Sequence, residues 1–205
     1  MTRPVFGHEK TRLDLAPHGQ VEYWPLAAPH SEIVDAEQEL SGRLEWRQLP
    51  VRMFGRSIPQ PRLTAFYGNR EVNYRYSGLT LQARPWTGEL EKLRRIAEEL
   101  SGRKYNSVLC NLYRDGRDYM GWHADDEREL GSNPVIASMS FGAERRFLLK
   151  PRNGEEERIE FLLKSGSLLV MRGDLQRHWL HQLPRALRIS RKRINLTFRQ
   201  IGAAA

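Results

Sequence analysis

The first half of the chain contains two segments with the apolar spacing of amphipathic helices. Across residues 88–101 apolar side chains recur every three or four positions, Thr87 can cap the start, and Gly102 can end the helix. A shorter helix is predicted for residues 31–41, with a serine at its start and a glycine just beyond its end. Residues 44–84 hold short β-like runs interrupted by proline and glycine, which predicts strands and turns.

After Gly102 the pattern changes to short alternating or apolar runs, which are typical of strands. Many short strands at regular spacing indicate a β-sandwich or barrel. We therefore expect an α+β fold that is mainly β, a jelly roll (double-stranded β-helix) braced on one outer face by the two N-terminal helices. The strands expected are 107–113, 135–141, 146–150, 158–163, 167–171, 176–183 and 193–200.

The last predicted strand alternates strictly between polar and apolar residues. One face would carry two arginines, and the other would be fully apolar: Arg193, Asn195, Thr197 and Arg199 against Ile194, Leu196 and Phe198. Two arginines without an interleaved acid need solvent or an anion. Either this face lies on the outside, or it lines a concave surface that binds a dicarboxylate. Asn111 and Tyr113 have the same phase on an earlier predicted strand.

Composition narrows the class of protein. With 205 residues and 40% apolar residues the chain can bury one core, and no apolar run reaches the roughly 20 residues of a membrane span. The lone Cys110 excludes an intrachain disulfide and a cysteine-based zinc finger. No secretory signal is expected, so we predict a cytoplasmic protein. The net charge of +8 favours a polyanionic partner such as nucleic acid, although a merely basic protein would look the same.

A candidate metal site begins with His123 and Asp125. In an extended segment residues i and i+2 point the same way, so one short stretch can offer both ligands. A third ligand could come from His178 or His181, and spacing alone does not choose between them. Two neutral imidazoles and one carboxylate suit one face of an octahedral Fe(II) and leave positions open for substrate and O₂.

These residues resemble the AlkB family of Fe(II)/2-oxoglutarate dioxygenases, most closely its branch that repairs duplex DNA. The resemblance covers about residues 50–201 and rests on Asn111-Leu112-Tyr113, His123-Ala124-Asp125, His181-Gln182-Leu183-Pro184 and the R-x-N-x-T-F-R run from Arg193 to Arg199. It implies an N-terminal extension with the first helix over residues 1–45, irregular or weakly stranded up to residue 30. Residues 46–201 would hold nucleotide-recognition hairpins and the dioxygenase core in one structural domain.

The resemblance also implies roles for single residues. It selects His181 as the third iron ligand and makes His178 a neighbour that packs or touches the nucleic-acid backbone. Arg199 would pair with the distal carboxylate of 2-oxoglutarate, and Arg193 would lie near the iron-chelating end and Asp125. The remaining members of the cosubstrate pocket would be Asn111, Tyr113, Asn195 and Thr197.

On the substrate side, the resemblance makes Tyr76 the stacking partner of a flipped base, with His123 on its other face and Tyr74 in the same groove. Phe54 would be an intercalating finger, although it could simply be buried in a hairpin. Asp126 and Glu127, beside the expected metal ligands, could attract a cationic methylated base, or they could form an ordinary solvated turn. The expected substrate-binding residues are Phe54, Gly55, Arg56, Arg62, Tyr74, Tyr76, Asp126 and Glu127.

The expected function is therefore oxidative demethylation of N-alkylated bases, of the 1-methyladenine and 3-methylcytosine type, in duplex DNA. The alkyl group would be hydroxylated and lost as an aldehyde, with Fe(II), 2-oxoglutarate and O₂ as cofactor and cosubstrates. We expect a monomer without membrane contact, associated with the nucleoid in a bacterium or the nucleus in a eukaryote. One alternative keeps the chemistry on single-stranded DNA or RNA, where no Phe54 finger is needed. A remote alternative is a basic, non-catalytic nucleic-acid-binding β-sandwich without an iron site.

Overall fold

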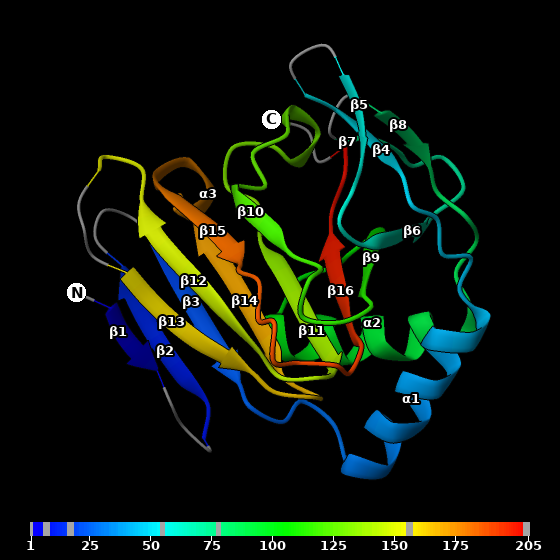
Figure 1. The fold of residues 1–205 in the computed structure, drawn as a ribbon, viewed down its shortest axis with the longest axis horizontal. Helices are drawn as coiled ribbons and strands as arrows, with labels where there is room; N and C mark the ends of the chain where they lie inside the picture. Colours follow the sequence, from blue (N-terminus) through cyan, green and yellow to red (C-terminus); the bar gives the residue numbers. More distant parts are fainter. Residues whose placement is uncertain are drawn as a thin grey trace.

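Two β-sheets face one another in the computed structural model, which describes residues 2–5, 9–15, 19–53, 56–76, 79–154 and 158–202 (Figure 1). The larger sheet has the order β2-β3-β14-β11-β16-β9-β6, and the smaller has the order β1-β13-β12-β15-β10. The larger sheet consists of β2 (Thr11–Leu15), β3 (Gly19–Trp24), β6 (Leu63–Gly68), β9 (Ser107–Tyr113), β11 (Ile136–Gly142), β14 (Leu168–Gly173) and β16 (Arg193–Arg199). The smaller consists of β1 (Thr2–Val5), β10 (Met120–His123), β12 (Arg145–Pro151), β13 (Arg158–Leu163) and β15 (Trp179–Leu183).

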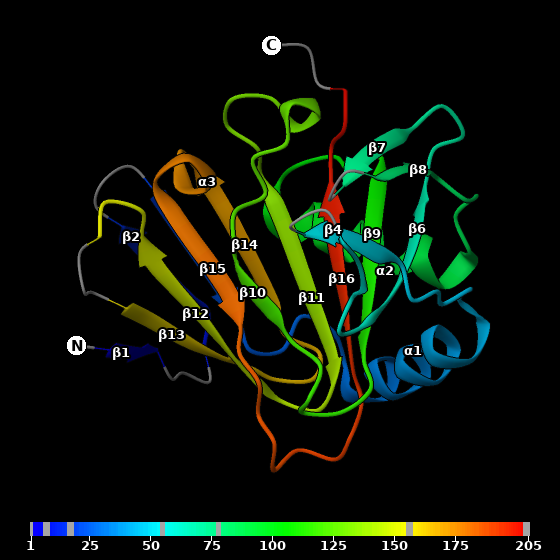
Figure 2. The same ribbon diagram turned by 45° about the horizontal axis from the view of Figure 1, so that its top comes forward.

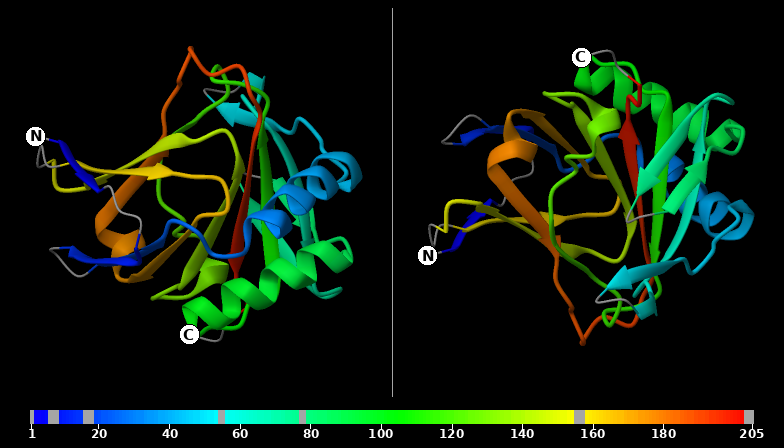
Figure 3. Two further views of the ribbon diagram at one scale, coloured as in Figure 1. Left: turned by 90° about the horizontal axis from the view of Figure 1, so that it is seen from below. Right: turned by 90° about the horizontal axis from the view of Figure 1, so that it is seen from above.

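Two helices, α1 (His30–Arg43) and α2 (Gly88–Ser101), cover the outer face of the larger sheet (Figure 3). As predicted, the Thr87 side chain accepts a hydrogen bond from the backbone N–H of Leu90 at 3.2 Å, and Gly102 ends α2 with a φ of 65°. The apolar stripes of the helices share one buried cluster with the outward-facing residues of β16: Ile33, Leu40, Leu90 and Leu93 with Ile194, Leu196 and Phe198.

Two hairpins lie beside β6, at the edge of the larger sheet (Figures 1 and 2). The first pairs β4 (Pro50–Met53) with β5 (Arg56–Pro59), and the second pairs β7 (Asn73–Tyr76) with β8 (Leu79–Gln82). They fall within the 44–84 stretch where proline and glycine predict strands and turns. Two short helical turns complete the fold, the 3-10 helix η1 (Arg128–Leu130) and α3 (Leu175–His178).

The strand β16 is buried on both faces, and its polar face points into the space between the sheets. On one side Arg193 lies opposite Tyr113 and Asn195 opposite Asn111 in β9. On the other side β11 places serines opposite Asn195 and Thr197. The polar residues therefore line the interior of the jelly roll and do not face bulk solvent. Of the two alternatives left open by the sequence, the polar face thus lines the concave surface.

Four parts of the fold differ from the sequence prediction. The first helix begins at His30 after Pro29 with no side-chain cap, so Ser31 is not its N-cap, and it continues through Gly42 to Arg43. Residues 2–24, expected to be irregular or weakly stranded, contain three strands that pair with β13 and β14 or with each other. The strand expected over 176–183 begins only at Trp179, because the Asp174 carbonyl accepts hydrogen bonds from two following backbone N–H groups and forms a helical turn. The strand β10 was not predicted. No helix in the described part of the chain is long and apolar enough to cross a membrane.

Candidate metal and cosubstrate site

Strand pairing brings the two expected histidines together. His123 ends β10 and lies directly opposite His181 in β15, so their ring centroids are 4.1 Å apart. Asp125 follows two residues after His123, and its Oδ1 atom is 3.9 Å from His123 Nε2. One ligand atom from each of these three residues lies within 4.8 Å of the others, which is a separation that one metal ion can bridge.

Hydrogen bonds to neighbouring groups fix the orientation of this trio. The Nδ1 atom of His123 is 2.9 Å from the Gly121 carbonyl oxygen, which leaves Nε2 as the nitrogen that can bind a metal. The backbone N–H of Asp125 donates to the side-chain oxygen of Gln176 at 2.9 Å, and Gln176 is itself buried. The loop that carries Asp125 is therefore held from α3, an element outside the predicted ligand motif.

The protonation states suit a cation. Burial lowers the pKa of His181 to about 3 and also lowers that of His123, so both imidazoles are neutral at pH 7. Burial of Asp125 opposes its ionisation, but the Arg199 guanidinium outweighs it and holds the pKa of that carboxyl at about 2. Two neutral imidazoles and one ionised carboxylate are the donor set expected for Fe(II).

The two arginines of β16 occupy opposite ends of the site. Arg199 forms a buried ion pair with Asp125, with 2.9 Å between Nη2 and Oδ1. Arg193 is 2% exposed, donates to Ser140 Oγ at 2.9 Å, and has no carboxylate within ion-pair distance among the described residues. The resemblance implied that Arg193 lies beside Asp125. This is wrong, because Arg199 lies there instead. The strand spans seven residues, and its first residue is far from the end that carries Arg199.

A single pocket contains the metal trio and every residue expected to bind the cosubstrate. Asn195 donates to Ser138 Oγ at 2.8 Å, and Asn111 accepts from Arg62 Nε at 2.9 Å. The apolar part of the lining was missed from the sequence, because such residues look like ordinary core. The lining residues are Arg62, Leu109, Asn111, Tyr113, Met120, His123, Asp125, Ser138, Phe147, Met171, His181, Leu183, Arg193, Asn195, Thr197 and Arg199.

Comparison with known proteins places the chain in a family. Residues 20–199 match the model of the 2OG-Fe(II) oxygenase superfamily. The chain belongs to this superfamily. Membership implies Fe(II), 2-oxoglutarate and O₂ as cofactor and cosubstrates, and His123, Asp125 and His181 could bind the iron.

Individual relatives of this oxygenase confirm the resemblance to AlkB proteins. Over 173 residues it is 42% identical to rat "Alpha-ketoglutarate-dependent dioxygenase alkB homolog 3", a match that covers 80% of the chain and 58% of the relative. Over 158 residues it is 42% identical to mouse "DNA oxidative demethylase ALKBH2", covering 74% and 66%. The chain thus spans about three fifths of the length of these curated relatives. The solved structure of OsALKBH1 superposes with a TM-score of 0.66 at 16% identity, covering 93% of this chain and all of that one, which supports the jelly-roll fold alone.

The residues expected to contact substrate are less completely defined in this oxygenase. Phe54 and Gly55 lie outside the described residues, as do the side chains of Arg56 and Tyr76. Of the expected set, Arg62 lines the pocket. Its role as a substrate contact stays a prediction.

The position expected for Tyr74 is wrong. Tyr74 is fully buried, stacks on Phe66 with 5.7 Å between ring centroids, and lies beneath the Arg199 guanidinium at 5.4 Å. A side chain without exposed surface cannot stack on a base, so Tyr74 supports Arg199. Alternation along β7 could not reveal this, because the hairpin packs against the sheet on the face that carries Tyr74.

The two acids next to the metal ligands differ in environment. Asp126 is exposed and forms an ion pair with Arg152 at 2.5 Å, and Arg152 also donates to the Gln176 carbonyl. Glu127 is half-buried, and burial together with nearby Asp125 raises its pKa. Neither acid lines the pocket. Their proposed attraction for a cationic base stays a prediction.

Proposed function

We propose that this oxygenase is an oxidative demethylase that repairs N-alkylated bases in DNA. The observation that carries the proposal is the single pocket that combines a His-Asp-His trio, with Asp125 and His181 buried and His123 half-buried, with a buried arginine that has no acidic partner among the described residues. A metal and a dianion would together satisfy both features. The name of the mouse relative, "DNA oxidative demethylase", supports this chemistry and this substrate class.

In this proposal the protein residues hold the reactants. His123, Asp125 and His181 would bind iron, which would use O₂ as the oxidant and 2-oxoglutarate as the co-reductant for hydroxylation. Arg193 would receive the distal carboxylate of 2-oxoglutarate, because it lies at the far end of the pocket and has no acidic partner there. Arg199 would hold Asp125 in place. The polar wall of the pocket would be completed by Asn111, Tyr113, Asn195 and Thr197.

The substrate would be a base such as 1-methyladenine or 3-methylcytosine, flipped out of the stack at a cost of a few kcal/mol. Hydroxylation of its N-alkyl group and loss of the aldehyde would restore the normal base. The excess of Lys and Arg, 33 against 25 Asp and Glu, would give affinity for phosphates without sequence preference. The exposed basic residues of the stretch 185–192 would contribute to this contact: Arg185, Arg188, Arg191 and Lys192. The non-catalytic alternative leaves the His-Asp-His trio unexplained.

We further propose duplex DNA as the preferred form, with Phe54 as the finger that fills the gap left by the flipped base. The same chemistry on single-stranded DNA or RNA is the alternative. We propose a monomer that works in the compartment holding the DNA.

The test uses matched oligonucleotides that carry one 1-methyladenine, either single-stranded or in duplex. Protein loaded with Fe(II) and 2-oxoglutarate is exposed to O₂, and mass spectrometry follows loss of the methyl group. Duplex repair that is slowed by Phe54→Ala, with single-strand repair unchanged, supports the full proposal. Repair of the single strand alone would retain the chemistry and overturn the duplex assignment. Binding of both oligonucleotides without repair of either would overturn the demethylase proposal.

A further inference from the structure

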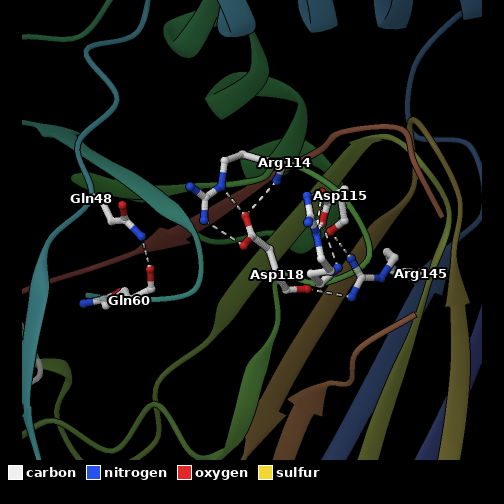
Figure 4. Close-up of polar contacts among 7 residues, drawn as sticks. Gln48, Gln60, Arg114, Asp115, Asp118 and Arg145 are labelled. Carbon is white, nitrogen blue, oxygen red and sulfur yellow. Dashed lines mark hydrogen bonds and ion pairs between the residues drawn. The ribbon is translucent and has the colours of Figure 1, made fainter. Parts of the chain in front are cut away.

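A further buried arginine, Arg145, lies behind the pocket. Arg145 begins β12, is 1% exposed, and donates to three backbone carbonyls. Those of Asp118, at 2.9 Å, and Asp115, at 3.3 Å, can be followed in Figure 4, and the third is that of Pro184 at 2.6 Å. Two of these carbonyls belong to the turn between β9 and β10, and the third follows β15. Arg145 therefore links the turn that precedes β10 and His123 to the segment that follows β15 and His181.

Among the described residues, no carboxylate forms an ion pair with Arg145. The Asp118 side chain accepts from Arg114 Nε and Nη2 at 2.8 and 2.9 Å, and the Asp115 side chain pairs with Arg117 at 2.6 Å (Figure 4). Both acids of the turn thus pair with other arginines, and the hydrogen bonds of Arg145 within the described part of the chain go to backbone carbonyls. Burying an arginine in this way is costly unless the charge serves a nearby anion.

The pocket offers a place for that anion. Both guanidiniums lie near the Tyr113 ring, with Arg193 Cζ at 5.3 Å and Arg145 Cζ at 5.9 Å from its centroid. Burial, reinforced by the charge of Arg145, lowers the pKa of Arg193 to about 10. Two buried like charges therefore lie near one aromatic ring at the end of the pocket that faces away from Asp125, and a carboxylate there would relieve their repulsion.

We propose that Arg145 is a positioning residue for the acidic cosubstrate. Its hydrogen bonds hold the turn 114–118 against Pro184 and so fix the positions of Tyr113 and Arg193. Its charge adds positive potential where the distal carboxylate would bind. The inference rests on the proposed function, because it takes 2-oxoglutarate as the anion.

The test measures binding without turnover. Isothermal titration calorimetry gives the affinity of the protein for Mn(II) and then the affinity of the Mn(II)-loaded protein for 2-oxoglutarate. Arg145→Met is expected to weaken 2-oxoglutarate binding about tenfold, or about 1.4 kcal/mol, while Mn(II) affinity changes less than about twofold. Arg145→Lys keeps the charge but not the three-carbonyl fork, so it should recover part of the loss. The matched control is Arg146→Met, which removes an exposed arginine paired with Glu160.

A double-mutant cycle with Arg193→Met separates positioning from general stability. If Arg145 acts through Arg193 and Tyr113, the second substitution adds little to the loss caused by the first. Fully additive losses, an unchanged 2-oxoglutarate affinity in Arg145→Met, or an equal fall in Mn(II) affinity would each overturn the inference. Among the outcomes of this binding experiment, one would also overturn the proposed function: wild-type protein that binds Mn(II) but no 2-oxoglutarate.

Discussion

The ion pair between Arg199 and Asp125 gives a quantitative prediction for the metal-free protein. Replacing Arg199 by Met keeps the apolar stem over the Tyr74 ring but removes the partner of a carboxylate that is itself 2% exposed. Removing one partner of a buried pair costs about 3–5 kcal/mol. For a domain of about 200 residues, 1 kcal/mol shifts the melting temperature by about 2–4 °C. Arg199→Met should therefore melt about 6–20 °C below wild type.

A bound metal should shrink that difference. Mn(II) supplies Asp125 with a new cationic partner, so thermal unfolding with saturating Mn(II) should raise the melting temperature of Arg199→Met more than that of wild type. Arg199→Lys, which retains a charge, should lie between the two proteins. The reasoning is refuted if Arg199→Met melts with wild type in the absence of metal, or if Mn(II) stabilises both proteins equally.

Three further predictions concern other parts of the structure. Gln176→Met removes the acceptor for the backbone N–H of a metal ligand, so Mn(II) binding measured by calorimetry should weaken about tenfold, while half-buried Gln182→Met should leave it unchanged. Gly142→Ala would place a Cβ 2.5 Å from a backbone carbonyl at a φ of +83°; urea unfolding should show a loss about 2 kcal/mol larger than for Gly154→Ala, which has a φ of +88° but open space. Burial raises the pKa of Tyr105 from 10.0 to about 12, so its stabilising contribution is complete below pH 10 and is lost as pH rises to 12. Unfolding curves at pH 8 and pH 11 should therefore show Tyr105→Phe losing less stability over this range than wild type, and equal losses would contradict the assignment.

Elements governed by local signals were predicted from the sequence. The helix α2 begins and ends at the predicted residues because Thr87 and Gly102 act within one turn of its ends. The strands β9 (Ser107–Tyr113) and β13 (Arg158–Leu163) also match their predicted bounds. Elements that depend on distant pairing were missed. The strand β10 is short and irregularly paired with β15, and the N-terminal strand β1 is defined by its parallel pairing with β13, more than 150 residues away.

The site shows the same division between local and distant information. The spacing of His123 and Asp125 and the polar face of β16 could be read directly from the sequence. Alternation shows that two arginines share a face, but it does not show which end of the strand meets Asp125. That depends on the antiparallel register of β16 against its neighbours, so the expected order of Arg193 and Arg199 was reversed. Gln176 and Arg145 carry no motif, since each acts on backbone groups from a distant element.

The central claim is that the His-Asp-His trio and the arginine-lined pocket perform one oxidation, and the stoichiometry of the reaction tests it most directly. Succinate and released formaldehyde are quantified in the same reaction with a methylated oligonucleotide, for wild type and for His181→Ala. The account predicts one succinate for each methyl group lost in wild type, and neither product with the variant, because a buried metal ligand is missing. Methyl loss without succinate, or undiminished turnover in His181→Ala, would contradict it.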